Sequence, residues 1–400
     1  METATERASV NVAGCGAVTA LGAGIGVLDE SLRKGESGLF PVEVRMGPGH
    51  GMQRLVAGRV PESVVDRACD RLPEVGEDRA FRMATMAARE AFEQAGEFLQ
   101  RTPSRRQGLV VSTTKASIDA LERWIWKEPV SEAALARVQP GRFARDCALA
   151  LGVTGPVQCV SAACISGLLA LRQGAAMIQR GQADVVHVVG VDVLSAFVVA
   201  GFASLKSMDP EGCRPFDRRR VGLSLGEGAG AMVLMRGDRD VPGTRLIGWG
   251  ISNDANHLTG PSRDGAGLAL AMNRALAKAG RPGREVDCLH AHGTGTPYND
   301  AMESLAFRTV FPDPMPSVVA SKGALGHTLG AAGVLESIIC VRAMELGLLP
   351  GTPRLGELDP VAPASMILKP TPKPGLRTIM KVNSGFGGTN AALVFERSHR

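Results

Sequence analysis

The chain has 400 residues and a formal net charge of +5, with 44% hydrophobic and 21% charged residues. This length exceeds what one hydrophobic core usually organises, so two domains or a duplicated unit are expected. Only 4% of the residues are aromatic, which argues against a stacking surface for nucleic acid. No uninterrupted apolar run reaches the roughly eighteen residues that a membrane-spanning helix needs. Neither nucleic acid nor a membrane is therefore an expected partner.

Eight cysteines are dispersed along the chain, without a CxxC pair or the spacing of a disulfide framework. Such usage is typical of a reducing compartment. The first seven residues also lack the apolar segment behind a basic start that marks a secretory leader. The sequence therefore predicts a cytoplasmic protein.

The first half of the chain alternates predicted strands with predicted helices. In chain order we expect a strand over 9–22, a helix over 26–34, an irregular stretch over 35–77, an amphipathic helix over 78–96 closed by Gly96 and a strand over 108–112. There follow helical structure over 117–152, a helix from about Cys164 to 181, a strand over 184–191, a loop-rich segment over 195–220 and a strand over 226–236.

The second half repeats this order of elements. Its predicted elements are a strand from 243, a helix over 267–280, a strand leading into 290–297, a helix over 326–347 and a strand over 389–397. Matched elements are displaced by about 160 to 185 positions, which chance rarely produces over four elements. We therefore predict two duplicated α/β halves, residues 1–240 and 241–400, each with a sheet covered by helices.

Cys164 follows a turn of small residues and precedes an apolar run at helical spacing. A helix start favours negative charge, so a thiolate here would be a nucleophile with a lowered pKa. The alternative is a buried structural cysteine. His327 holds a similar position in the second half, again near a predicted helix start. Two reactive side chains at equivalent positions of a repeat are expected to meet at a pseudo-twofold axis, which favours a functional role.

Four glycine-rich stretches remain, at 224–231, 290–300, 321–333 and 383–390. None follows the phosphate-binding GxxxxGKS/T pattern or the dinucleotide GxGxxG pattern. Glycines beside a histidine indicate backbone that approaches a substrate closely. These stretches add His292 to Cys164 and His327 as candidates for nucleophilic catalysis.

A metal site is the competing use of the histidines, because His290 and His292 alternate and Asp300 is close in sequence. No HExxH or CxxC spacing accompanies them. We therefore predict that no metal is bound.

Four motifs carry a family resemblance: SAACISG at 161–167, HAHGTGTP at 290–297, KGALGHTLGAAG at 322–333 and GFGGTN at 385–390. In this order they resemble the motif set of the β-ketoacyl-acyl-carrier-protein synthases, elongating class with a Cys-His-His site, in the thiolase superfamily. The resemblance implies a thiolase-like α/β fold with five layers in α-β-α-β-α order. It extends over nearly the whole chain and is looser in the first hundred residues.

The implied activity is that of a 3-oxoacyl-acyl-carrier-protein synthase, an acyltransferase. It performs decarboxylative Claisen condensation of an acyl-cysteine with malonyl-acyl-carrier protein and releases CO2. The implied partners are acyl carrier protein, malonyl and acyl thioesters, and a second subunit in a homodimer or heterodimer. No cofactor is expected beyond the phosphopantetheine that the carrier brings. Acyl chain length, and fatty-acid against polyketide or polyene synthesis, stay open.

The resemblance also implies roles for single residues. Cys164 accepts the acyl chain, while His292 and His327 hydrogen-bond the malonyl thioester carbonyl and stabilise the enolate. Backbone N–H groups of Cys164 and Phe386 form the oxyanion hole, and Phe386 gates the acyl pocket.

Four further residues support these groups in the same comparison. Lys322 orients the loop of the second histidine with Glu336 as its partner, and Asp300 and Glu303 hold the loop of the first.

One departure from the family pattern stands beside the gate. The usual NSFGFGG appears here as VNSGFGG, residues 382–388, so that Ser384 replaces a Phe or one residue is missing. His257 is interpreted as structural, His290 as an unlikely catalyst and Cys159 as a core residue. The alternative function is a non-catalytic, chain-length-determining partner subunit, a class that lacks the nucleophilic cysteine. A thiolase would need a second cysteine in these motifs, and a primer-accepting Cys-His-Asn synthase would lack the GHTLGAAG histidine.

Overall fold

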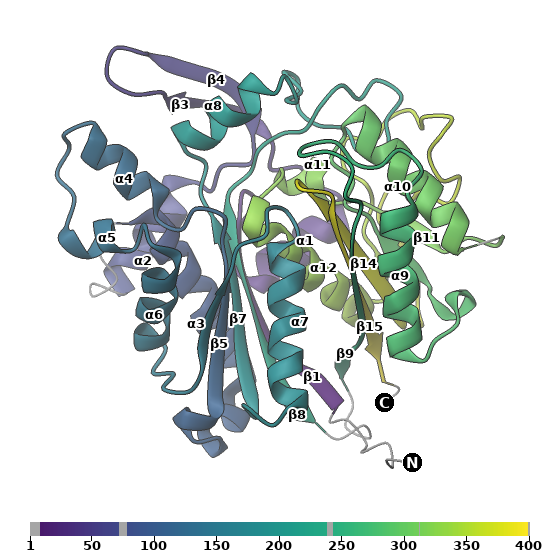
Figure 1. Ribbon diagram of the computed structural model, residues 1–400, viewed down its shortest axis with the longest axis horizontal. Coiled ribbons are helices and arrows are strands. Elements are labelled where there is room, and N and C mark those ends of the chain that lie inside the picture. The colour runs from purple at the N-terminus through teal and green to yellow at the C-terminus, as the bar shows by residue number, and fades with distance from the viewer. Residues whose placement is uncertain (1–8, 72–77, 238–242, 312, 399–400) are drawn as a thin grey trace.

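One mixed sheet runs through the computed structural model, which describes residues 9–71, 78–237, 243–311 and 313–398 (Figure 1). In spatial order, the strands of the first half are β1 (Ser9–Thr19), β8 (Gly228–Gly237), β7 (Val185–Asp192), β5 (Gln107–Ser112) and β6 (Val157–Val160). Those of the second half are β9 (Thr244–Asn253), β15 (Thr389–Arg397), β14 (Thr378–Gly385), β10 (Cys288–His290) and β11 (Ser317–Val319). The predicted boundary at 240 and 241 lies outside the described residues.

The pairing of the strands is the same in both halves. From the centre outward, two antiparallel pairings are followed by two parallel ones, in the first half and again in the second. The halves join where Asn11 of β1 pairs with Arg245 of β9. This shared order confirms the predicted duplication of an α/β unit.

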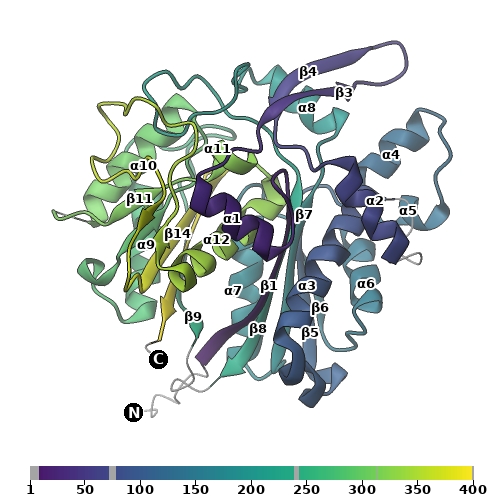
Figure 2. The ribbon, with the colours of Figure 1, turned by 180° about the vertical axis from the view of Figure 1, so that it is seen from behind.

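Four helices complete the layers. Helix α3 (Arg79–Arg101) covers the outer face of the first half and α9 (Ala266–Ala279) that of the second. Between the halves lie α7 (Ser166–Gln179) and α12 (Ala332–Leu346), which contact each other and strands of both halves (Figures 1 and 2). Their apolar side chains fill the largest core cluster, which explains why both helices are buried almost all round. The layers are, in order, α3, the strands of the first half, α7 with α12, the strands of the second half, and α9. The predicted five-layer arrangement is therefore confirmed.

The stretch expected to be irregular contains regular elements. A hairpin of β3 (Phe40–Arg45) and β4 (Met52–Ala57) projects from the body beside α8 (Ala196–Ser204), in both views (Figures 1 and 2). Val42 and Val44 alternate with exposed neighbours, a period-two pattern that the sequence interpretation missed. Helix α8 likewise lies in the segment expected to be loop-rich.

Gly96 does not close its helix as predicted. The residue has φ +35° and ψ −111°, which are not helical values, yet helical structure resumes beyond this kink and runs to Arg101. Glycine adopts this left-handed backbone at little cost, so it produces a kink.

The other helices are α1 (Ile25–Lys34), α2 (Glu62–Arg71), α4 (Ile118–Ile125), α5 (Glu132–Ala136), α6 (Pro140–Ala150), α10 (Pro297–Val310) and α11 (Lys322–Leu325). The shortest strands are β2 (Gly22–Ala23), β12 (Leu348–Leu349) and β13 (Thr371–Pro372). Within the described ranges, no helix is long and apolar enough to cross a membrane.

Candidate active site

Cys164 lies on a tight turn between β6 and α7. Ala163 has φ +47°, a backbone conformation that costs a non-glycine residue about 1 kcal/mol or more. The Ser166 hydroxyl holds this turn, because it accepts from the Ala162 N–H at 2.8 Å and donates to the Ala163 carbonyl at 2.6 Å. From β14, the Asn383 amide donates to the Cys164 carbonyl at 3.1 Å. The turn is thus fixed from both halves of the chain.

The structure brings Cys164, His292 and His327 together. The thiol sulfur and one ring nitrogen of each imidazole all lie within 4.8 Å of one another. The two rings meet edge to face, with centroids 5.3 Å apart. His292 follows β10, and His327 stands in the loop between α11 and α12, five residues before α12 rather than at its start. All three are buried.

Hydrogen bonds fix which nitrogen of each imidazole carries the proton. The Lys322 ammonium lies 3.1 Å from His292 Nδ1, and the Leu329 backbone N–H donates to His327 Nδ1 at 3.1 Å. An ammonium and a backbone N–H can only donate, so both Nδ1 atoms are acceptors and both neutral rings carry hydrogen on Nε2. Burial and the Lys322 ammonium lower the pKa of His327 to about 3 and that of His292 well below its ordinary value. Both histidines are therefore neutral N–H donors at pH 7.

A buried ion cluster lies behind the histidines. The Lys322 ammonium donates to the Glu336 carboxylate at 2.6 Å and to the His292 carbonyl at 2.6 Å. The Lys322 ammonium thus contacts His292, whereas the sequence interpretation expected this lysine to orient the loop of His327. Lys381 of β14 pairs with the second oxygen of Glu336 at 2.8 Å. Burial alone would raise the pKa of Glu336, but the two ammonium groups lower it to about 2.

Lys381 is a site residue that sequence reasoning missed. It stands in the ordinary strand sequence TIMKVNSG, and no local motif distinguishes it from a surface lysine. The one available signal is a lysine whose two adjacent strand residues, Met380 and Val382, are both apolar.

Two carboxylates of α10 hold the loop of His292. Glu303 accepts from the backbone N–H groups of His292 at 2.6 Å and Gly293 at 2.7 Å. Asp300 accepts from the Gly295 N–H at 3.2 Å and the Phe216 N–H at 2.8 Å. Both carboxylates therefore accept hydrogen bonds from backbone N–H groups of the His292 loop, the segment with which the sequence interpretation associated them.

The Cys164 thiol is more basic than the sequence interpretation expected. Burial raises its pKa to about 11, against the opposing effects of the Lys322 ammonium and the Phe386 backbone N–H. Helix α7 begins only at Ser166, so the thiol stands before the helix start, and its loss of hydration outweighs the nearby positive charge. The expectation of a lowered pKa is wrong for the free protein.

The trio opens into a pocket of about 390 Å³. The Phe386 ring, on the β14–β15 turn, stacks on Phe202 of α8 with centroids 5.8 Å apart. Ser384 also lines the pocket and donates to the Asn390 side chain at 2.6 Å. Strands β14 and β15 pair there without a bulge, so Ser384 occupies a regular strand position.

His257 lies at the rim of this pocket, where its Nδ1 accepts from the Thr259 and Gly260 N–H groups, each at 3.1 Å. Its contacts shape a turn, in line with the structural interpretation. Cys159 on β6 packs against the core cluster that contains α3.

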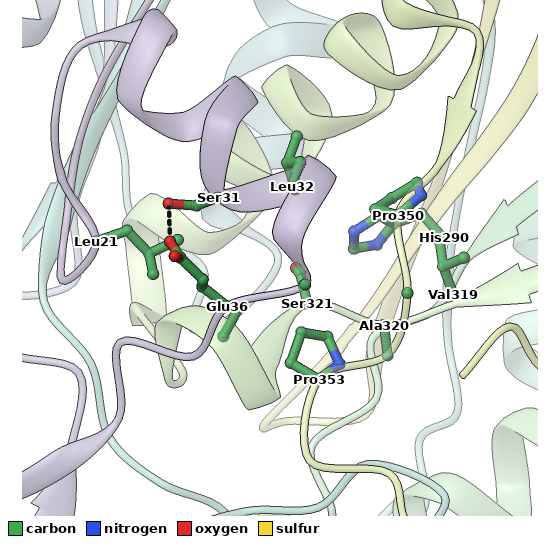
Figure 3. A pocket seen from close by; sticks show the side chains of 13 residues that line it. Leu21, Ser31, Leu32, Glu36, His290, Val319, Ala320, Ser321, Pro350 and Pro353 are labelled. Atoms are coloured by element: carbon green, nitrogen blue, oxygen red, sulfur yellow. Dashed lines mark hydrogen bonds between the residues drawn. The ribbon is translucent and has the colours of Figure 1, made fainter. Parts of the chain in front are cut away.

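His290 faces a different cavity, of only about 20 Å³, beside α1 (Figure 3). Its Nδ1 lies 3.2 Å from the Ala291 carbonyl. The cavity has room for about one water molecule, so it is no substrate site. Within the described residues, the close group of possible metal ligands is the Cys164 trio and includes neither His290 nor Asp300. A metal ion binds an imidazole through the lone pair of a ring nitrogen. In His292 and His327, Nε2 carries a hydrogen and Nδ1 already accepts a hydrogen bond, so neither nitrogen offers a free lone pair.

Comparison with known proteins gives the family. A family model for the β-ketoacyl synthase N-terminal domain matches residues 7–239, and one for the C-terminal domain matches residues 244–355. The chain belongs to the β-ketoacyl synthase family. The resemblance inferred from the four motifs is therefore confirmed, and the family is one of condensing, acyl-transferring proteins.

Two of three similar proteins span nearly the whole chain, and the third covers about three fifths of it. Nodulation protein E of Rhizobium meliloti (strain 1021) is 32% identical over 97% of this chain and 99% of its own length. The mitochondrial 3-oxoacyl-[acyl-carrier-protein] synthase of Arabidopsis thaliana is 38% identical over 61% of this chain and 57% of its own length. The solved ishigamide ketosynthase/chain length factor gives a TM-score of 0.87 at 31% identity, covering 98% of this chain and 100% of that chain.

Proposed function

We propose that this chain is a 3-oxoacyl-acyl-carrier-protein synthase, which condenses an acyl-cysteine with malonyl-acyl-carrier protein and releases CO2. The observation that carries the proposal is the trio of Cys164, His292 and His327 at the base of one pocket. A thiol and two neutral N–H donors are what acyl transfer followed by enolate formation requires.

Acyl transfer comes first in the proposed sequence. The Cys164 sulfur forms a bond to the acyl carbonyl carbon, the carrier thioester C–S bond breaks, and the thiol proton leaves with the carrier thiol. The Phe386 N–H lies at the Cys164 sulfur, where together with the Cys164 N–H it would bind the oxyanion. A thiol with a raised pKa stays protonated in the resting protein, so the nucleophile forms only as substrate binds.

Decarboxylation and condensation follow on the same face. The malonyl thioester carbonyl accepts hydrogen bonds from Nε2 of His292 and His327. The bond to the carboxylate breaks, CO2 leaves, and the electron pair forms an enolate that these donors stabilise. The enolate carbon then attacks the acyl-cysteine carbonyl, a C–C bond forms, and the Cys164 sulfur departs with the electrons of the C–S bond and takes up a proton from solvent, which restores the thiol.

The proposed chemistry uses no metal or organic cofactor of the protein's own; the phosphopantetheine thioester arrives on acyl carrier protein.

We also propose a two-subunit assembly, with a second copy or a related subunit. β6 ends the strand order of the first half, and its exposed Val157 stands at that edge. An open edge strand is a site at which another chain can continue a sheet. The name of the ishigamide relative joins a ketosynthase to a chain length factor, which favours the related subunit.

The alternative of a non-catalytic, chain-length-determining subunit fits the fold equally well. Such a subunit needs no nucleophile, whereas here Cys164 is present and two histidines and a lysine are arranged around it. The complete site favours catalysis.

The test is incubation with malonyl-carrier protein and a series of acyl-carrier proteins, with detection of the 3-oxoacyl product by mass spectrometry. We expect condensation by the native protein and none by Cys164→Ala. Acylation of Cys164 without product at any chain length, alone or with a related subunit, would contradict the proposal. Condensation by Cys164→Ala would overturn the choice of nucleophile.

A further inference from the structure

Lys381 is fully buried, and its ammonium is surrounded by oxygen atoms. It donates to the carbonyls of Val382 at 2.7 Å and Ala291 at 2.9 Å, and it pairs with Glu336 at 2.8 Å. A buried ammonium costs several kcal/mol in lost hydration unless such partners replace the water. The reaction as proposed above gives this residue no task.

Each oxygen on Lys381 belongs to a segment that carries a site residue. Ala291 directly precedes His292, and Val382 lies on the strand that ends in the Phe386 turn. Glu336 is the partner of Lys322, whose ammonium in turn reaches His292 Nδ1. One ammonium therefore ties together the loops of the histidine donor and the oxyanion hole.

The net charge of the buried ion cluster also depends on Lys381. Burial lowers the pKa of Lys381, and the adjacent Glu336 carboxylate opposes that shift. With both lysines protonated, the ammonium groups of Lys322 and Lys381 and the carboxylate of Glu336 leave a net charge of +1 beside two neutral imidazoles. Without Lys381, the remaining pair would be neutral. A buried positive charge stabilises negative charge that develops nearby, because few water molecules screen it.

We propose that Lys381 is a positioning residue, which supplies the surplus positive charge of the active site and stabilises the enolate and oxyanion through His292 and Lys322. This inference rests on the proposed condensation. Lys381 does not touch the reacting atoms, so its effect should fall on the chemical steps rather than on substrate binding.

The kinetic test compares four proteins that differ in cluster charge. The native cluster carries +1, Lys381→Met carries 0, Glu336→Gln carries +2, and the double variant Lys381→Met/Glu336→Gln carries +1 again through Lys322. For Lys381→Met we expect kcat for condensation to fall at least about tenfold, with KM for malonyl-carrier protein within about twofold. The double variant should regain a measurable part of the lost kcat, although it lacks both buried partners.

The pH profile supplies a readout that packing alone would not move. The charged and titratable groups around His292 are Lys322, Lys381, Glu336, Glu303, His290, His327 and Cys164. Removing the Lys381 charge favours imidazolium, so the acid limb of condensation should move to higher pH in Lys381→Met. The added loss of the Glu336 charge acts in the opposite sense, and the limb should move back in the double variant.

A measurement without substrate separates this inference from the proposed function. NMR of protein labelled with nitrogen-15 at histidine follows the titration of His292 and His327 directly. If the native protein does not condense, the proposed function fails, while the shift of both titrations to higher pH in Lys381→Met still tests the electrostatic role. Unfolding in urea and alkylation of Cys164 by iodoacetamide show that each variant retains a folded pocket.

Two results would overturn the inference. One is an equal loss of kcat in Lys381→Met and in the double variant, which would mean that charge is not the cause. The other is an unchanged histidine titration in a folded Lys381→Met protein.

Discussion

Gly167 of α7 and Gly333 of α12 pack backbone against backbone where the two central helices cross. A β-carbon on Gly167 would lie 2.6 Å from the Val334 nitrogen, and one on Gly333 would lie 2.5 Å from the backbone of α7. The contact is thus the same in both directions, as a duplicated unit requires. Because Cys164 precedes α7 and His327 precedes α12, this crossing sets the separation of thiol and imidazole.

Gly167→Ala should therefore destabilise the protein and weaken the site. The added methyl group must push the helices apart, and overpacking of this kind costs about 1–3 kcal/mol in the free energy of unfolding. Urea unfolding measures the loss. The matched control is Gly141→Ala in the first turn of α6, where a β-carbon meets nothing within 4 Å. That variant should stay within about 0.5 kcal/mol of the native protein, and an equal loss in both would refute the packing argument.

The convergence of the reactive residues could be predicted because its signals are local. Cys164, His292 and His327 each stand in a glycine-rich or small-residue stretch, and the repeat relates two of them. Helical and strand periodicity gave α9 and β15 nearly to the residue. These features depend on backbone approach and on spacing, which a sequence records directly.

Other features depend on burial, which a sequence records poorly. Lys381 becomes part of the site only because β14 lies between β10 and β15, with Glu336 45 positions away from it along the chain. The pKa of Cys164 follows from its loss of hydration, although the position near a helix start suggested the opposite direction. The place of Lys381 in the site and the direction of the Cys164 pKa shift are both determined by tertiary structure.

The raised pKa of Cys164 predicts how the free protein reacts with iodoacetamide. Only the thiolate reacts, and below a pKa of about 11 its fraction rises about tenfold per pH unit. The alkylation rate should therefore increase steadily from pH 7 to 10 without a plateau. Peptide mass spectrometry at Cys164 measures the rate, with Cys164→Ala as the blank. A plateau between pH 7 and 8 would indicate a thiolate stabilised in the resting protein.

Glu303→Gln should loosen the His292 loop. Both carboxylate oxygens accept backbone N–H groups, and an amide would turn its NH2 toward one of those donors. We expect a loss of about 1–3 kcal/mol in the free energy of unfolding and a lower kcat for condensation. Glu285→Gln at the surface, where the carboxylate pairs with Arg281 at 3.4 Å, should change stability by less than about 0.5 kcal/mol. Equal effects of the two substitutions would contradict the role of Glu303.

Phe202→Ala should shift the acyl-chain preference toward longer chains. The Phe202 ring lines the pocket and stacks on Phe386, so its removal leaves room in which additional methylene groups of the substrate can be buried. Each buried methylene contributes about 0.8 kcal/mol, so two should change the ratio of kcat/KM for long over short acyl donors by about tenfold. Cys164 acylation by short chains should persist, because the contribution proposed for Phe386 to the oxyanion hole is a backbone N–H, which the substitution leaves in place. Phe197→Ala on the same helix is the matched control, since that side chain is 61% exposed and does not line the pocket. An unchanged chain-length ratio in Phe202→Ala, or an equal change in Phe197→Ala, would place the acyl chain elsewhere.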